Sequence, residues 1–115
     1  MPQVEHYSNL FQALGNGSRL EIVRLLLSAF HLGGLKVGQI QQELKIPGST
    51  LNHHLEKLKQ VGLLKAHKEK QWIWYSVDQD TLTDMLRFLF SECCGRTDVV
   101  PVSAVAPNHF TRGKP

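Results

Sequence analysis

The chain has 115 residues, of which 42% are hydrophobic and 20% are charged, and it contains two cysteines. This length suits one domain with a single core and is too short for a two-domain enzyme. The cysteines are adjacent, Cys93 and Cys94, so they cannot join distant parts of the fold as disulfides do in small secreted proteins. No apolar run approaches the roughly 20 residues of a membrane helix, and no signal peptide is visible. We therefore expect a cytoplasmic protein that does not enter a membrane.

The net charge of +3 is ordinary, but the positive charge is concentrated in one stretch. Residues 45–72 contain six Lys and two Glu, a net charge of +4, whereas the rest of the chain carries seven basic and eight acidic side chains. A clustered basic surface is typical of proteins that bind the phosphate backbone of nucleic acids. Charge alone leaves a second interpretation open, a solvated lysine-rich face.

The first half of the chain predicts three helices. Residues 5–14 carry apolar side chains at helical spacing, and a Gly-Asn-Gly segment then breaks the pattern. Ser18 and Glu21 have the spacing of a capping box, so we expect a second helix over residues 18–30. That helix is apolar on most sides, which predicts a position at the centre of the core. A short third helix is expected over residues 35–44.

The second half predicts one more helix, a hairpin and a last helix. A Pro-Gly turn leads into a helix that begins at Gly48 or Ser49 and carries a narrow apolar stripe up to Val61. Residues 63–68 and 71–77 are rich in strand formers, which predicts a β-hairpin joined at Glu69 and Lys70.

An aspartate at position 78 or 80 is expected to cap the last helix, over about residues 79–93. The predicted fold class is mainly α with a β-hairpin, in the order of four helices, two strands and one helix. The folded domain is expected over residues 1–95, followed by an extended or flexible tail over residues 96–115.

This order of elements is typical of a winged helix-turn-helix. A short helix, a tight turn and an amphipathic helix form the helix-turn-helix, whose second helix needs one apolar stripe for docking and one polar face for the major groove. The hairpin that follows would be the wing, whose tip must be cationic to reach the DNA backbone or the minor groove. The basic stretch coincides with this helix and hairpin, and the two observations together favour DNA binding over a solvated face.

Three segments resemble the ArsR/SmtB family of winged-helix repressors. They are FQALGNGSRL at 11–20, STLNHHLEKLKQVGL at 49–63 and QWIWYS at 71–76, and the likeness extends over about residues 5–94. The resemblance implies a homodimer formed through the first and last helices. It also implies binding to double-stranded operator DNA at an imperfect inverted repeat, and release of the operator when an effector binds.

By the same resemblance, the fourth helix and the wing hold the DNA. Asparagine can pair with adenine, while Ser, Thr and His reach base edges or phosphates and Lys reaches phosphates. Ser49 has a second interpretation as a helix N-cap, and His54, beside the apolar stripe, is read as a packing or phosphate-contacting residue. The predicted DNA-binding residues are Ser49, Thr50, Asn52, His53, Lys57, Lys65, Lys68 and Lys70.

The family's best-known metal sites are absent from the sequence. The stretch that would hold a Cys-Val-Cys signature is LKVG at 35–38, and residues 78–94 contain no histidine for a zinc site. What remains is Cys93 and Cys94, in the position of the vicinal cysteines of arsenic-responsive members. Because thiolates favour soft metals and metalloids, the expected inducer is trivalent arsenic or antimony, or methylarsenite. No resident cofactor is required.

Other interpretations of the cysteine pair remain open. Trivalent arsenic usually takes three sulfurs and one chain supplies two, so a hydroxide, a carbon substituent or a thiol of the second subunit would complete the site. The pair could instead form a disulfide as a redox sensor, or have no sensing role. A winged-helix interaction module without DNA specificity is a further alternative. The sequence lacks a glycine-rich phosphate loop and any catalytic arrangement, so an enzyme is not expected.

Overall fold

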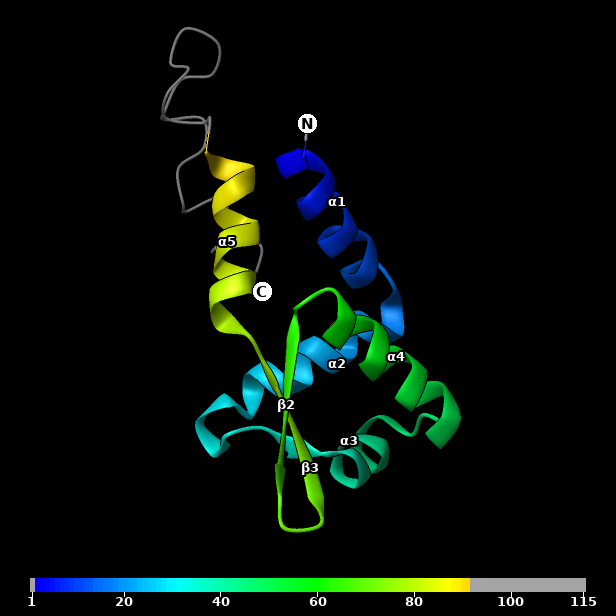
Figure 1. Ribbon diagram of the computed structural model, residues 1–115. Helices are drawn as coiled ribbons and strands as arrows, with labels where there is room; N and C mark the ends of the chain where they lie inside the picture. Colours follow the sequence, from blue (N-terminus) through cyan, green and yellow to red (C-terminus); the bar gives the residue numbers. More distant parts are fainter. Residues whose placement is uncertain (1, 92–115) are drawn as a thin grey trace, which may run out of the picture. The chain divides into compact units, whose positions relative to one another are not determined.

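The computed structural model describes residues 2–91 (Figure 1). The residues up to Met85 form one compact unit, and Leu86 begins a second. The elements are α1 (Pro2–Leu14), α2 (Gly17–Ser28), the 3-10 helix η1 (Phe30–Leu32), β1 (Leu35–Lys36), α3 (Val37–Leu44), α4 (Gly48–Gln60), β2 (Leu64–Glu69), β3 (Trp72–Val77) and α5 (Gln79–Phe90).

The predicted class, mainly α with a β-hairpin, is confirmed. Asp78 is the residue that caps the last helix, because its Oδ1 accepts a hydrogen bond from the backbone N–H of Thr81 at 3.2 Å. The predicted boundary between residues 95 and 96 lies outside the described residues. No helix within residues 2–91 is long and apolar enough to cross a membrane.

The start of α2 differs from the prediction, because Asn16 rather than Ser18 is the N-cap. Asn16 has an extended backbone (φ −111°, ψ 132°), and its Oδ1 accepts a hydrogen bond from the backbone N–H of Arg19 at 3.1 Å. The helix therefore begins at Gly17, and the capping box proposed for Ser18 and Glu21 is wrong. Asparagine caps at least as well as serine, and here it comes first along the chain.

The sheet has a third strand that the sequence did not predict. Leu35 and Lys36, expected in the third helix, form β1 and pair with Tyr75 and Trp74 of β3. The strand order is β1-β3-β2 and all pairs are antiparallel. The hairpin register ends at the pair Glu69 and Trp72, so the turn is at residues 70 and 71 and not at 69 and 70 as predicted.

Apolar side chains from both helices and strands form one core. Among the described residues, no polar or charged side chain is buried. The predicted stripe of α4 is buried, at 0–1% exposure for Leu51, Leu55 and Leu58, whereas Val61 is only partly buried. The remaining buried members are Leu10, Ala13, Ile22, Val23, Leu26, Ile40, Leu63, Leu64, Val77 and Met85.

Arg19 links three helices at the edge of this core. Its Nε donates a hydrogen bond to the carbonyl oxygen of Ala13 near the end of α1, at 2.6 Å. Its Nη1 lies 3.3 Å from Nδ1 of His54 on α4. Arginine has no acceptor, so His54 accepts this hydrogen bond on Nδ1 and is neutral when it does so. Burial of the ring, then the Arg19 guanidinium and then His53 lower the pKa of His54 below its ordinary value of 6.5.

Gly34 is required by the close approach of the chain to β3. Its φ is +116°, and a Cβ built there would collide with the carbonyl group of Tyr75. Gly38, at the start of α3, is the matched control, because a Cβ there meets nothing within 4 Å.

We expect Gly34→Ala to lower the free energy of unfolding by about 2–4 kcal/mol, from backbone strain plus the displaced strand. Gly38→Ala should raise it by up to about 1 kcal/mol, because alanine favours the helix. Urea denaturation followed by circular dichroism measures both. Equal effects of the two substitutions would show that β1 does not lie against β3 as described.

The lowered pKa of His54 predicts a pH dependence of stability. The unfolded chain binds the proton more readily than the folded chain, so this contribution is complete above the unfolded pKa of about 6.5. It is lost as the pH falls from there through the folded pKa. Thermal unfolding from about pH 8 to about pH 5.5 should show this loss in the natural chain and much less of it in His54→Gln. The exposed His53→Gln is the comparison and should keep most of the natural profile, because His53 is the smallest of the three causes of the lowered pKa of His54. A His54→Gln profile identical to the natural one would contradict the neutral His54.

Candidate nucleic-acid interface

The turn between α3 and α4 fixes where α4 begins. Lys45 ends α3 in the left-handed conformation (φ 56°, ψ 44°), and its N–H donates to the carbonyl oxygen of Gln41 at 2.7 Å. Ile46 packs against the core, and Pro47 is the N-cap of α4 with φ −55° and ψ 145°. The interpretation of Ser49 as an N-cap is therefore wrong. Ser49 lies inside the first turn, where its hydroxyl is exposed.

The first half of α4 presents a continuous polar surface. Ser49, Asn52 and His53 follow the spacing of one helix face and are all exposed. Thr50, His53 and Lys57 form an adjoining row and are exposed as well. The buried stripe fixes the opposite side of the helix, so the structure brings all five predicted residues of α4 onto its outer side.

His54 lies apart from this surface. It is partly buried and interacts with Arg19, so it belongs to the packing of α4 against the body of the domain. Of the two interpretations that the sequence left for His54, the structure supports packing.

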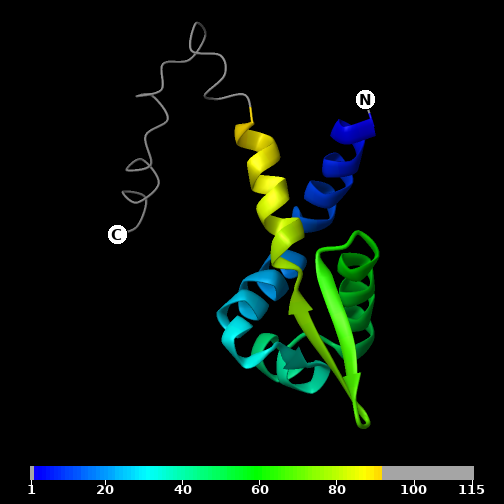
Figure 2. The same cartoon turned by 60° about the vertical axis from the view of Figure 1, so that its left-hand side comes forward.

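The predicted lysines of the wing lie on different sides of the hairpin. Leu64 and Ala66 turn to the core side of β2, which places Lys65 on the outer side. Lys68 is on the core side but near the tip, where it pairs with Ile73 and is exposed. Lys70 is in the turn, with φ 60°. The hairpin tip projects beyond the helices of the same unit (Figure 2). Lys68 and Lys70 lie near or in this tip, whereas Lys65, which pairs with Ser76, lies near the other end of β2.

Lys36 is a cation of the wing region that sequence reasoning missed. Its Nζ lies 4.5 Å from the ring centroid of Trp72 and 5.5 Å from that of Trp74. The contact depends on the pairing of β1 with β3, and a strand of two residues is too short to show an alternating pattern in the sequence.

The predicted metal ligands Cys93 and Cys94 lie outside the described residues. Within residues 2–91, no group of three or more His, Cys, Asp or Glu side chains is placed to hold a metal ion. The described helix α5 ends at Phe90, short of the predicted end at residue 93.

Comparison with known proteins agrees with this arrangement. Residues 16–66 match the family described as bacterial regulatory protein, arsR family. An uncharacterized HTH-type transcriptional regulator of Methanocaldococcus jannaschii is 35% identical over 89 residues, covering 77% of this chain and 97% of that protein. The transcriptional repressor SdpR of Bacillus subtilis is 29% identical over 84 residues, covering 73% of this chain and 89% of that protein.

Solved structures share the fold. The homodimeric winged helix-turn-helix DNA-binding domain of a possible ArsR-family regulator from Mycobacterium bovis is similar with a TM-score of 0.62 and 26% identity. The match covers 79% of this chain and 83% of that one. With its helix-turn-helix and its projecting hairpin, the chain belongs to the ArsR family of winged-helix transcriptional regulators.

Proposed function

We propose that this chain is a repressor that binds operator DNA as a homodimer and releases it when a trivalent arsenical or antimonial binds Cys93 and Cys94. The observation that carries the DNA-binding part is the exposed polar surface on the first half of α4, with a cationic wing on the same unit. The polar side of α4 enters the major groove, and the wing reaches the flanking backbone or minor groove.

The exposed side chains divide into two roles. The amide of Asn52 makes a bidentate contact with adenine, and Ser49, Thr50 and His53 reach base edges or phosphates. Lysines position the protein by neutralising phosphates without reading sequence. These positioning residues are Lys57 on α4 and Lys65, Lys68 and Lys70 on the wing.

A homodimer accounts for the predicted inverted repeat, because two-fold symmetry of the protein requires two-fold symmetry of the site. Apolar side chains on α5 support it: Leu86, Leu89 and Phe90 are 46–58% exposed. Val4 on α1 is 47% exposed. Large exposed apolar residues on one helix are typical of a surface that a partner covers, and the Mycobacterium bovis domain is described as homodimeric.

Two substitutions distinguish a residue proposed to read the base sequence from one proposed to position the protein on phosphates. Asn52→Ala should weaken the binding free energy for the preferred duplex by about 1–3 kcal/mol and reduce the preference for one base at one position. Lys70→Asn should weaken all duplexes alike and lower the salt slope of log K by about 1. Asparagine tolerates the left-handed backbone at this position, so the turn is kept. Fluorescence anisotropy from about 50 to about 200 mM salt measures both.

Arg24→Gln, an equal charge change at an exposed position of α2, is the control and should leave the slope unchanged. The duplex is one that the protein itself selects from a random pool. Salt-dependent binding with no preference for an inverted repeat would argue against a repressor and for an interaction module that meets an acidic partner.

The effector part of the proposal follows from donor chemistry. Two thiols react with a methylated arsenous acid, CH₃As(OH)₂, to form two As–S bonds and release two waters, with no change in oxidation state. With arsenite or antimonite, a hydroxide or a thiol of the second subunit completes the coordination. Cys93 follows the end of α5 by three residues. Binding there would reshape the chain next to the helix proposed for dimerisation, and so change the spacing of the two α4 helices.

Trivalent arsenicals should release a bound duplex, and Cys93→Ser should abolish this response without changing DNA affinity. Arsenite, antimonite, methylarsenite, zinc and peroxide are added side by side to the anisotropy assay. Release by peroxide alone, reversed by a thiol reductant, would indicate that the cysteine pair is a redox sensor and not a metalloid site. A normal arsenical response of Cys93→Ser would reject the cysteine site.

A further inference from the structure

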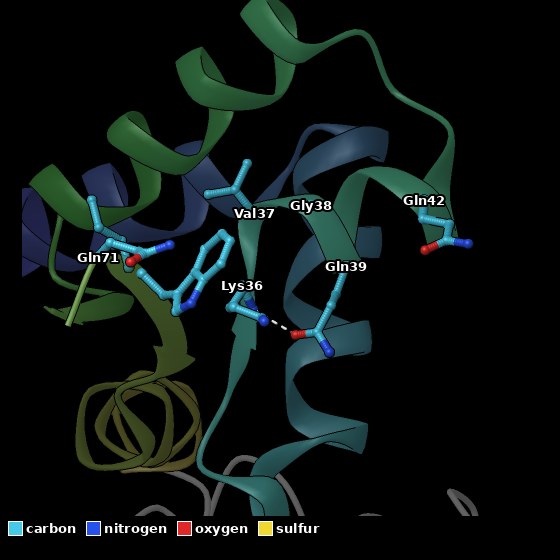
Figure 3. A pocket seen from close by; sticks show the side chains of 8 residues that line it. Lys36, Val37, Gly38, Gln39, Gln42 and Gln71 are labelled. Carbon is cyan, nitrogen blue, oxygen red and sulfur yellow. Dashed lines mark hydrogen bonds between the residues drawn. The ribbon is translucent and has the colours of Figure 1, made fainter. Parts of the chain in front are cut away.

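A hollow of about 510 Å³ lies between the start of α3 and the wing (Figure 3). Its lining comes from Lys36, from the first turns of α3 and from the wing at and after the turn, with no residue of α4. The volume is within the range of roughly 300–1,000 Å³ of sites that hold small organic molecules. The hollow is therefore large enough for a small ligand and separate from the base-reading surface.

The lining combines one cation, three amides and an apolar wall. Lys36 is the one charged side chain among the lining residues, and no carboxylate is among them. Gln39, Gln42 and Gln71 supply amides, and Trp72, which is 49% exposed, supplies an aromatic surface. The Oε1 of Gln39 accepts a hydrogen bond from the backbone N–H of Lys36 at 2.8 Å. That bond orients the Gln39 amide and leaves its NH₂ group to donate.

Lys36 is held in place before any ligand arrives. Its ammonium lies 4.5 and 5.5 Å from the ring centroids of Trp72 and Trp74, where the faces of the rings attract a cation. A cation–π contact uses the charge and does not require the ammonium's N–H donors to be hydrogen-bonded. The Lys36 ammonium therefore keeps donors for an anion, and the exposed indole beside it offers a flat apolar surface.

We propose that this hollow binds a planar aromatic carboxylate, and that its occupancy weakens DNA binding. The carboxylate accepts hydrogen bonds from Lys36, the ring packs against the exposed part of Trp72 that Lys36 does not cover, and the glutamine amides meet polar substituents. The regulatory half of the proposal rests on the proposed DNA-binding function. Gln71 lies in the turn of the wing next to Lys70. An anion bound here adds negative charge beside the lysines that would approach phosphates, which lowers the affinity for DNA.

The chain offers a direct readout of binding. It contains two tryptophans, Trp72 and Trp74, and Lys36 contacts both. In a ¹H–¹⁵N spectrum of the labelled protein, each indole N–H gives its own signal. Indole-3-acetate is the probe, indole-3-acetamide is its uncharged match, and acetate carries the anion without the ring. We expect a saturable shift of the Trp72 signal with indole-3-acetate, about tenfold weaker binding of the amide, and no saturation with acetate.

Two substitutions test the site without relying on Trp72. Lys36→Gln should weaken indole-3-acetate about tenfold and leave indole-3-acetamide unchanged. Gly38→Leu should block both, because the new side chain grows from a lining position where a Cβ meets nothing within 4 Å. Lys59→Gln, an equal charge change on α4 outside the lining, should bind like the natural chain.

The DNA assay separates this proposal from the one on which it rests. Indole-3-acetate should weaken duplex binding by the natural chain and by Cys93→Ser alike. It should leave duplex binding by Gly38→Leu unchanged. Absence of a saturable Trp72 shift, or equal binding of the acid and the amide, would overturn the site. Binding without any effect on the duplex would overturn its regulatory role. If the protein binds no duplex at all, the proposed function fails, and the spectra still decide whether the hollow binds the ligand.

Discussion

Burial of one side of α4 is the constraint on which the proposed interface depends. Leu51, Leu55 and Leu58 are 0–1% exposed, and burying each such side chain stabilises the fold by about 1.5–3 kcal/mol. Because these residues recur at helical spacing, the stripe fixes both the position of α4 and its rotation about its own axis. Asn52 and His53, which lie between them, therefore face outward, whereas His54 is partly buried against Arg19. The same pattern therefore stabilises the domain and exposes the residues proposed to read DNA.

Hydrogen bonds also help to position α4, in addition to its apolar stripe. The guanidinium of Arg19, a residue of α2, contacts the end of α1 and His54 of α4, and the backbone N–H of Arg19 donates to the N-cap Asn16. Arginine suits this position because its donors are arranged in a fixed fork. The neutral His54 that accepts from it is adjacent in sequence to the exposed His53, yet the two have different roles. One turn of helix thus holds both a packing residue and a candidate DNA contact.

The position of the wing depends on β1, the short strand that pairs with β3 on the side away from β2. β3 is the central strand, with β2 on one side and the short β1 on the other. Gly34 allows the chain to approach β3, and Lys36 then lies over the two tryptophans. This arrangement ties the wing to the start of α3, the first helix of the helix-turn-helix. A ligand in the hollow between them would act on the wing and on this helix together, which is why occupancy there is proposed to affect DNA binding.

The sequence by itself determined the order of the five α-helices and the hairpin, the stripe of α4 and the family. Each of these depends on a local period or on a run of residues, and such patterns are visible without coordinates. The tertiary structure decided what depends on contacts between distant segments. It showed that Leu35 and Lys36 form a strand, that His54 meets Arg19, and that Lys36 completes a hollow with Trp72. These pairings join residues up to about a third of the chain apart, and no local pattern encodes a partner at that separation.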